Sequence, residues 1–212
     1  WNTRQMLDGI EPVLNLAAAA NMDLAEASDI VTDYLTAFGL EAQDAGHFAD
    51  MMAEAMSTSN TTVELLGESY KNCSATAHSL GYEVEDVTAV LATMANAGIK
   101  GGEAGTALST IMTRLATNTG ECDDKLEEYG VQVYNSSGDI RDLSQILNEM
   151  GGIWEDLTDK QQANLVKSIA GQNHYAQLQT IIAGVSTQAK AAGQSFNDYA
   201  SSLRSCDGAA EK

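Results

Sequence analysis

The chain of 212 residues is long enough to bury a core, and its single proline, 18 glycines and 6% aromatic residues indicate closely packed helices instead of a sheet. Its 30 acidic and 11 basic side chains give a formal charge of -19, which argues against direct nucleic-acid binding because the surface would repel phosphate. No apolar run approaches the roughly 20 residues of a membrane-spanning helix.

The first part of the chain is expected to form two helices separated by a glycine. Residues 1–8 predict a short helix that Gly9 breaks, and Pro12 lies near the first turn of the next helix, where its missing N–H does no harm. Residues 13–20 are nearly all apolar or alanine, which predicts a buried helix.

A capping-box pattern, Asp23 followed by Glu26, predicts the start of a helix that ends at Gly39. The next helix, over residues 41–57, carries methionines on one side: Met51, Met52 and Met56. A methionine-rich face can be a promiscuous binding surface, but methionine is also a common filler of cores. We interpret this face as core and keep the binding surface as the alternative.

The capping-box pattern recurs at Thr61 and Glu64, before a helix that runs to about residue 80. Gly81 follows it and suits a helix C-terminus, because glycine readily adopts the left-handed conformation found there. Helices of three to five turns, each bounded by a cap or a glycine, favour a compact bundle over one continuous rod.

The chain is organised around residues 90–115. One predicted helix, over residues 87–97, ends at Gly98, and a second begins after the break at residues 100–102. The first turns of the second helix hold small residues, which let two backbones approach closely: Ala104, Gly105 and Ala107. The segment therefore predicts a tight helix-turn-helix pair at the centre of a helical domain.

Residues 131–141 contain the strand candidate of the sequence. They follow a short predicted helix, over residues 121–129, and combine an alternating stretch with an Asn-Ser-Ser-Gly turn, which predicts a small β-hairpin. Asp139 and Asp142 beside the turn suggest calcium, but the spacing of an EF-hand loop is missing. We interpret the segment as a plain turn.

The next helix is predicted to be interrupted at residues 151–152, which are both glycine. Thr158 and Gln161 form a further capping box before a helix that ends at Gly171, and residues 172–183 supply one more helix.

The last part of the sequence is polar and small, with a thin apolar stripe of Phe196, Tyr199 and Leu203. We expect a helical domain over residues 1–183 and a polar helical extension over residues 184–212, leading toward a region outside this sequence. The predicted fold is all-α, a compact bundle of about eight to ten short helices with one hairpin. A sustained heptad pattern is missing, so this piece is not itself a coiled-coil ruler.

The segment NAGIKGGEAGTAL, residues 96–108, resembles the most distinctive part of the core region of phage tail tape measure proteins, from siphophages or integrated prophages. Residues 22–40, 57–67 and 131–147 resemble the same core in the same order, so the likeness covers most of the chain. The resemblance implies a structural component of a phage tail, not an enzyme, that sets tail length during assembly and takes part in genome delivery.

The resemblance also implies a location and partners. The protein would occupy the lumen of the virion tail, and the host bacterial cytoplasm during assembly. Its partners would be other copies of itself, the tail tube protein, tail assembly chaperones, and baseplate or tail tip proteins. Membrane contact is expected only through regions outside this fragment.

Two other functions remain open at this stage. One is an interaction module that binds the tail tube, baseplate or assembly chaperones. The other is a membrane-active or cell-wall-active module of the ejection apparatus, although nothing in the sequence resembles a peptidoglycan hydrolase core.

A search for chemistry finds no catalytic, cofactor-binding or metal-binding residues, and no cofactor is expected. The three histidines, His47, His78 and His174, lie far apart, and a His-Glu-x-x-His pattern is absent. Residues 101–103 loosely resemble a phosphate-cradling turn, but the flanking pattern is missing and Glu103 would repel phosphate. We interpret this turn as a hinge or a tight helix pair.

Three cysteines, Cys73, Cys122 and Cys206, show no paired or metal-ligand spacing, so we expect reduced thiols. The sequence begins at Trp1 without a charged and apolar leader. We therefore expect no targeting segment and regard the chain as a piece of a longer polypeptide.

Overall fold

The computed structural model describes residues 3–117, 121–191 and 196–211, and these residues form an all-α fold without a strand. They contain eleven α-helices, slightly more than expected. In chain order, the α-helices are α1 (Thr3–Ala20), α2 (Leu24–Ala37), α3 (Ala45–Thr58), α4 (Val63–Leu80), α5 (Val84–Asn96), α6 (Gly101–Thr117), α7 (Glu121–Glu128), α8 (Leu143–Ile153), α9 (Asp159–Ala170), α10 (Tyr175–Ala191) and α11 (Phe196–Arg204). Three short 3-10 helices are η1 (Ala42–Asp44), η2 (Trp154–Asp156) and η3 (Ala209–Glu211).

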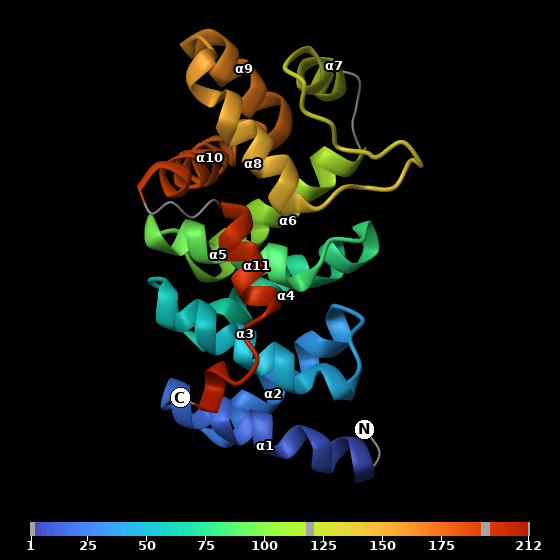
Figure 1. Cartoon of the computed structure of the whole chain (residues 1–212), viewed down its shortest axis with the longest axis vertical. Coiled ribbons are helices and arrows are strands. Elements are labelled where there is room, and N and C mark those ends of the chain that lie inside the picture. Colours follow the sequence, from blue (N-terminus) through green and yellow to red (C-terminus); the bar gives the residue numbers. More distant parts are fainter. Residues whose placement is uncertain (1–2, 118–120, 192–195, 212) are drawn as a thin grey trace.

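The helices are stacked along the long axis of the molecule, from α1 at one end to α7 and α9 at the other (Figure 1). From α1 to α10 the chain runs along this stack, and its C-terminal segment then runs back toward α1. Helix α11 lies against α3, α5 and α8, and η3 contacts α1 and α3. Both ends of the chain therefore lie at the α1 end (Figure 1). One continuous apolar core runs through the stack.

Glycine stops divide the chain into short helices, as the sequence predicts. At the end of α5, the N–H of Gly98 donates to Ala95 at 3.0 Å, and the N–H of Ile99 donates to Met94 at 3.0 Å. This pair of hydrogen bonds requires a residue with a left-handed backbone conformation just after the helix, and Gly98 adopts it with φ +88°. Equivalent pairs close α2 at Gly39 and α4 at Gly81, so these predicted helix ends are confirmed.

The predicted break at Gly9 is wrong, because α1 is continuous and contains Pro12. The proline removes one backbone donor from the helix, but burial of the α1 face that holds Val13 and Leu16 favours continuity. Its ring also finds room beside Gly46 of α3, where an added Cβ would lie 3.8 Å from Cγ of Pro12.

The predicted β-hairpin near residues 131–141 is also wrong, since the structure has only an isolated antiparallel bridge between Tyr134 and Ile140. The side-chain oxygen of Asn135 accepts hydrogen bonds from the N–H groups of Ser137 and Asp139, which closes a tight turn. The arms on either side are too short for a ladder, and Val133 is buried against the helices instead.

Several helix boundaries differ from the prediction. The cap of α4 is Thr62, one residue later than expected, and its side chain accepts from the N–H of Leu65. Helix α8 continues through residues 151–152, and α10 extends past residue 183 to Ala191. The capping box of Thr158 and Gln161 is confirmed.

The methionine-rich face of α3 belongs to the core. Met51 and Met52 are fully buried, and Met56 is partly buried against the core. The core interpretation is confirmed for Met51 and Met52, and Met56 keeps only part of its side chain exposed.

The predicted division between a helical domain over residues 1–183 and a polar extension over residues 184–212 stays a prediction. In the predicted apolar stripe of α11, Phe196 and Leu203 are fully buried and Tyr199 is partly buried against the core. The side chain of Arg204, at the end of α11, also reaches Asp86 of α5 at 2.5 Å.

Candidate interaction site

Helices α4 and α6 approach each other closely. A Cβ added to Gly105 would lie 2.1 Å from the carbonyl oxygen of Ser69, so only glycine fits there. The Ser69 hydroxyl donates to the carbonyl oxygen of Gly101 at 2.9 Å, which fixes the start of α6 on α4. The predicted close crossing is present, but its closest partner is α4 and not the preceding helix of the pair.

Residues 101–103, which form the first turn of α6 in the structure, are covered by α4. Asn72 donates to the carbonyl oxygen of Gly102 at 3.0 Å, and the carboxylate of Glu68 lies beside Gly101. A carboxylate at this helix N-terminus disfavours phosphate by like charge. The interpretation as a tight helix pair fits this geometry.

The structure brings two of the three histidines together, because His47 and His78 line one pocket of about 380 Å³, whereas His174 is not part of it. His47 on α3 contacts Glu85 of α5 and Asp207 of the C-terminal segment, His78 lies beside Gly39, and His174 precedes α10. The described residues contain no group of three histidine, cysteine or carboxylate side chains that could hold a metal ion.

Two of the three thiols are described. Cys73 and Cys206 are free, and burial raises the pKa of each thiol to about 12. Both are therefore protonated near neutral pH and are poor nucleophiles, because the thiolate is the reactive form. The side chain of Cys122 lies outside the described residues.

His47 links the C-terminal segment to the stack, at 2.9 Å from Glu85 and 3.1 Å from Asp207. Burial alone would lower its pKa, but the hydrogen bonds to Asp207 and Glu85 outweigh this effect and raise the pKa above 6.5. The link is therefore fully present below the pKa of the unfolded chain and is lost as pH rises through the higher folded pKa.

We expect His47→Gln to reduce the pH dependence of stability. The fall in Tm between about pH 5.5 and about pH 8.5 should be larger for the wild type than for the variant, as measured by circular dichroism. Equal falls in both proteins would contradict the link.

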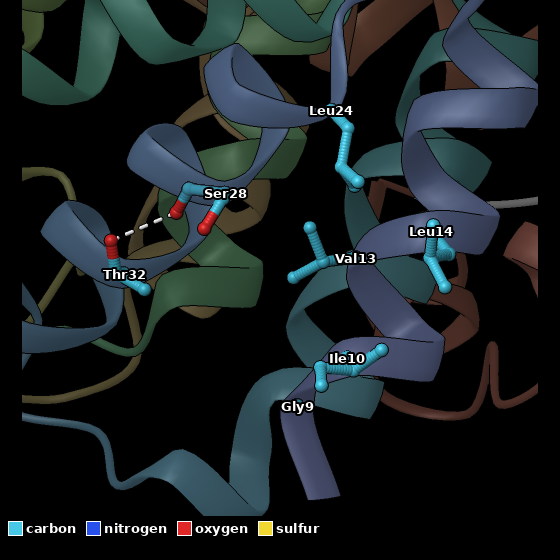
Figure 2. A pocket seen from close by; sticks show the side chains of 7 residues that line it. All are labelled: Gly9, Ile10, Val13, Leu14, Leu24, Ser28 and Thr32. Carbon is cyan, nitrogen blue, oxygen red and sulfur yellow. Dashed lines mark hydrogen bonds between the residues drawn. The ribbon is translucent and has the colours of Figure 1, made fainter. Parts of the chain in front are cut away.

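An apolar groove lies between α1 and α2 at the end of the stack (Figure 2). Its volume is about 650 Å³. The walls carry Ile10, Val13 and Leu14 from α1 and Leu24, Ser28 and Thr32 from α2. Val13 and Leu24 project into the space between the helices, and Ser28 and Thr32 stand on the opposite wall from α1 (Figure 2).

The large apolar side chains that are exposed to solvent line this groove. Ile10, Leu14 and Leu24 are 51%, 45% and 47% exposed, and they are the large apolar side chains left exposed in the described part of the chain. Clustering of such residues is typical of an interaction site, whereas single exposed apolar residues are ordinary.

The groove offers few polar groups to orient a small ligand. The Thr32 hydroxyl donates to the carbonyl oxygen of Ser28 at 2.8 Å, so it is already used within α2 (Figure 2). Small-molecule sites combine an apolar pocket with several convergent polar groups. The chemistry of this groove fits an extended apolar surface better.

The sequence prediction missed this groove. The buried helix predicted over residues 13–20 is buried on one face only, because Leu14 is exposed. Ile10 fell outside the predicted helix because a break was expected at Gly9. On the continuous helix, Ile10 and Leu14 are four residues apart and share a face, which is the signal that could have revealed it.

None of the helices in the described ranges combines the length and the apolar character that crossing a bilayer requires.

The comparisons with known proteins agree along the chain. A family model described as phage-related minor tail protein matches residues 1–171. The chain is 30% identical over 212 residues to the tape measure protein of Pneumococcus phage Dp-1. This alignment covers all of the present chain and 18% of that protein. It is 27% identical over 176 residues to the probable tape measure protein of Escherichia phage P2, covering 82% of this chain and 22% of that protein.

The chain thus spans about a fifth of the length of these curated relatives. No solved structure matches it.

Proposed function

The chain belongs to the phage-related minor tail protein family, and we propose on this premise that it is a folded module of a tape measure protein that sets tail length and takes part in genome delivery. The observation that supports the proposal most is the match along the whole chain to a protein named a tape measure protein. Membership of the family supports a structural role in the tail and interaction with other tail proteins.

The role of this module differs from that of a ruler. An extended helix rises 1.5 Å per residue, so a long helical protein can set a length in proportion to its number of residues. The chain described here is a stack of short helices with a continuous core, and it returns to the end where it began (Figure 1). We assign it the part of a folded module joined to extended segments elsewhere in the polypeptide.

Partners are part of this proposal. The module would contact other copies of itself, the tail tube, assembly chaperones, and baseplate or tail tip proteins, in the tail lumen and in the host cytoplasm during assembly. The apolar groove between α1 and α2 favours the interaction role among the alternatives, because it is an exposed surface suited to a protein partner.

A deletion in the phage that encodes this chain tests the proposal. Removing residues 3–211 should either abolish tails or shorten them by far less than the roughly 300 Å that this many residues would span as a helix. Tail lengths are measured by negative-stain electron microscopy. Shortening by the full helical amount would contradict a folded module, and normal infectious tails would contradict a role in assembly.

A deletion of equal size in a predicted long helix of the same polypeptide is the matched control. It should shorten the tail by about 1.5 Å per residue removed. An unchanged tail length in this control would contradict the length-setting role of the whole protein.

A further inference from the structure

We propose that the groove between α1 and α2 binds an amphipathic helix from another protein, with lysine or arginine side chains on both sides of its apolar face. The proposal rests on the shape, the exposed apolar residues and the charge of this end of the stack, and it does not depend on the tape measure assignment.

The apolar residues of the groove are arranged in helical rows. On α1, Ile10 and Leu14 are four residues apart, and on α2, Leu24, Ser28 and Thr32 follow the same spacing. Such rows are the ridges between which another helix packs. A helix lying here would cover the apolar side chains that α1 and α2 leave exposed.

Carboxylates flank these rows. On α2, Ala27, Val31 and Leu35 form the buried row, the groove row lies next to it, and the row beyond holds Asp29 and Asp33. Both aspartates are exposed, as is Glu11 next to Ile10 on α1. A helix in the groove would therefore meet negative charge along both edges.

The charged side chains of a long stretch of the sequence are all acidic. Between Gln5 and Tyr70 the chain has twelve acidic residues and neither lysine nor arginine. Charge complementarity therefore selects a partner with basic flanks. The same field repels a second copy of this end of the stack and repels anionic membranes.

A strand or a small molecule fits the groove less well. Its walls are two α-helices, so the groove has no sheet edge to which a strand could add. Its hydroxyls are too few to orient a small polar ligand.

The test uses the purified chain and synthetic helical peptides of about 18 residues, or five turns. The first peptide carries a leucine stripe with lysine flanks, and the second has the same stripe with glutamate flanks. A third has the composition of the first but scattered leucines. Fluorescence anisotropy should show the first binding at least about tenfold more tightly than the other two, with affinity falling as salt rises.

Variants locate the binding. The double variant Leu14→Ser with Leu24→Ser keeps the net charge and should weaken binding of the first peptide at least about tenfold. Asp29→Asn with Asp33→Asn should weaken it about three- to tenfold. The matched control, Glu127→Gln with Glu128→Gln, removes the same charge from exposed positions on α7 at the other end of the stack and should have little effect (Figure 1).

Four results would overturn the proposal. The first two are equal binding of the peptides with lysine and glutamate flanks, and unchanged binding of the first peptide by the variant with Leu14→Ser and Leu24→Ser. The third is self-association of the chain that this variant abolishes. The fourth is binding of the chain to vesicles of phosphatidylglycerol through the same residues. Thermal unfolding of each variant confirms that it is folded, which is expected because the substituted side chains are exposed.

Discussion

Replacing Gly105 with alanine should lower the free energy of unfolding by about 3 kcal/mol, although the same change elsewhere in a helix usually stabilises. The added Cβ would lie 2.1 Å from the carbonyl oxygen of Ser69 and 2.8 Å from its Cα. These are backbone atoms of a buried part of α4, so they cannot rotate away. The two helices would have to separate, which would also lengthen the hydrogen bond from Ser69 to Gly101.

Gly152 in α8 provides the matched control. A Cβ added there meets nothing within 4 Å, so Gly152→Ala should stabilise the protein by about 0.5–1 kcal/mol through helix propensity alone. Gly151 tests an intermediate case, because its added Cβ would meet a side-chain atom of buried Val185 at 2.9 Å but no backbone atom closer than 3.4 Å. Urea unfolding measures all three variants, and a Gly105→Ala variant as stable as the wild type would contradict the close crossing.

The central helices illustrate what the sequence can specify. Gly98 and the apolar spacing around it predicted the end of α5, because this local backbone conformation depends on neighbouring residues. The small residues of α6 predicted a close crossing, but they could not identify α4 as the closest partner. A small side chain permits a close approach, whereas the choice of partner depends on the packing of the whole stack.

The errors have the same origin. Gly9 and Pro12 predicted a helix break from local preferences, and the buried face of α1 overrides them. The short arms around Asn135 alternate like strands, but they form a single bridge, and Val133 is buried against the helices. The groove was missed because it depends on how α1 and α2 lie together.

Replacing Arg204 with methionine should destabilise the protein by about 2–3 kcal/mol, because it leaves the buried carboxylate of Asp86 without its cation. Asp86 is fully buried in α5. Its Oδ1 accepts from Nη2 of Arg204 at 2.5 Å, and its Oδ2 accepts from the N–H of Ser144 in the first turn of α8 at 3.1 Å. We place the loss at the lower end of the usual range because the Arg204 side chain is 31% exposed.

The pair of Arg141 and Glu149 provides the control, because its carboxylate is partly exposed whereas that of Asp86 is buried. These side chains also meet at 2.5 Å, but Glu149 is 38% exposed and water can replace the arginine. Arg141→Met should therefore cost about 1 kcal/mol or less. A loss as large as that of Arg204→Met would show that length and packing of the arginine, and not the buried charge, decide the effect.

A double variant identifies the buried charge as the cause. In Asp86→Asn with Arg204→Met, the asparagine oxygen can still accept from the N–H of Ser144, so the contact with α8 remains while the uncompensated charge is gone. We expect the double variant to recover at least about 1 kcal/mol relative to Arg204→Met alone in urea unfolding. Hydrogen exchange should show early loss of protection in α11 for the single variant and its return in the double variant. If the double variant is no more stable than the single one, the ion pair does not hold α11 on the stack, and the buried Phe196 and Leu203 side chains must supply that attachment.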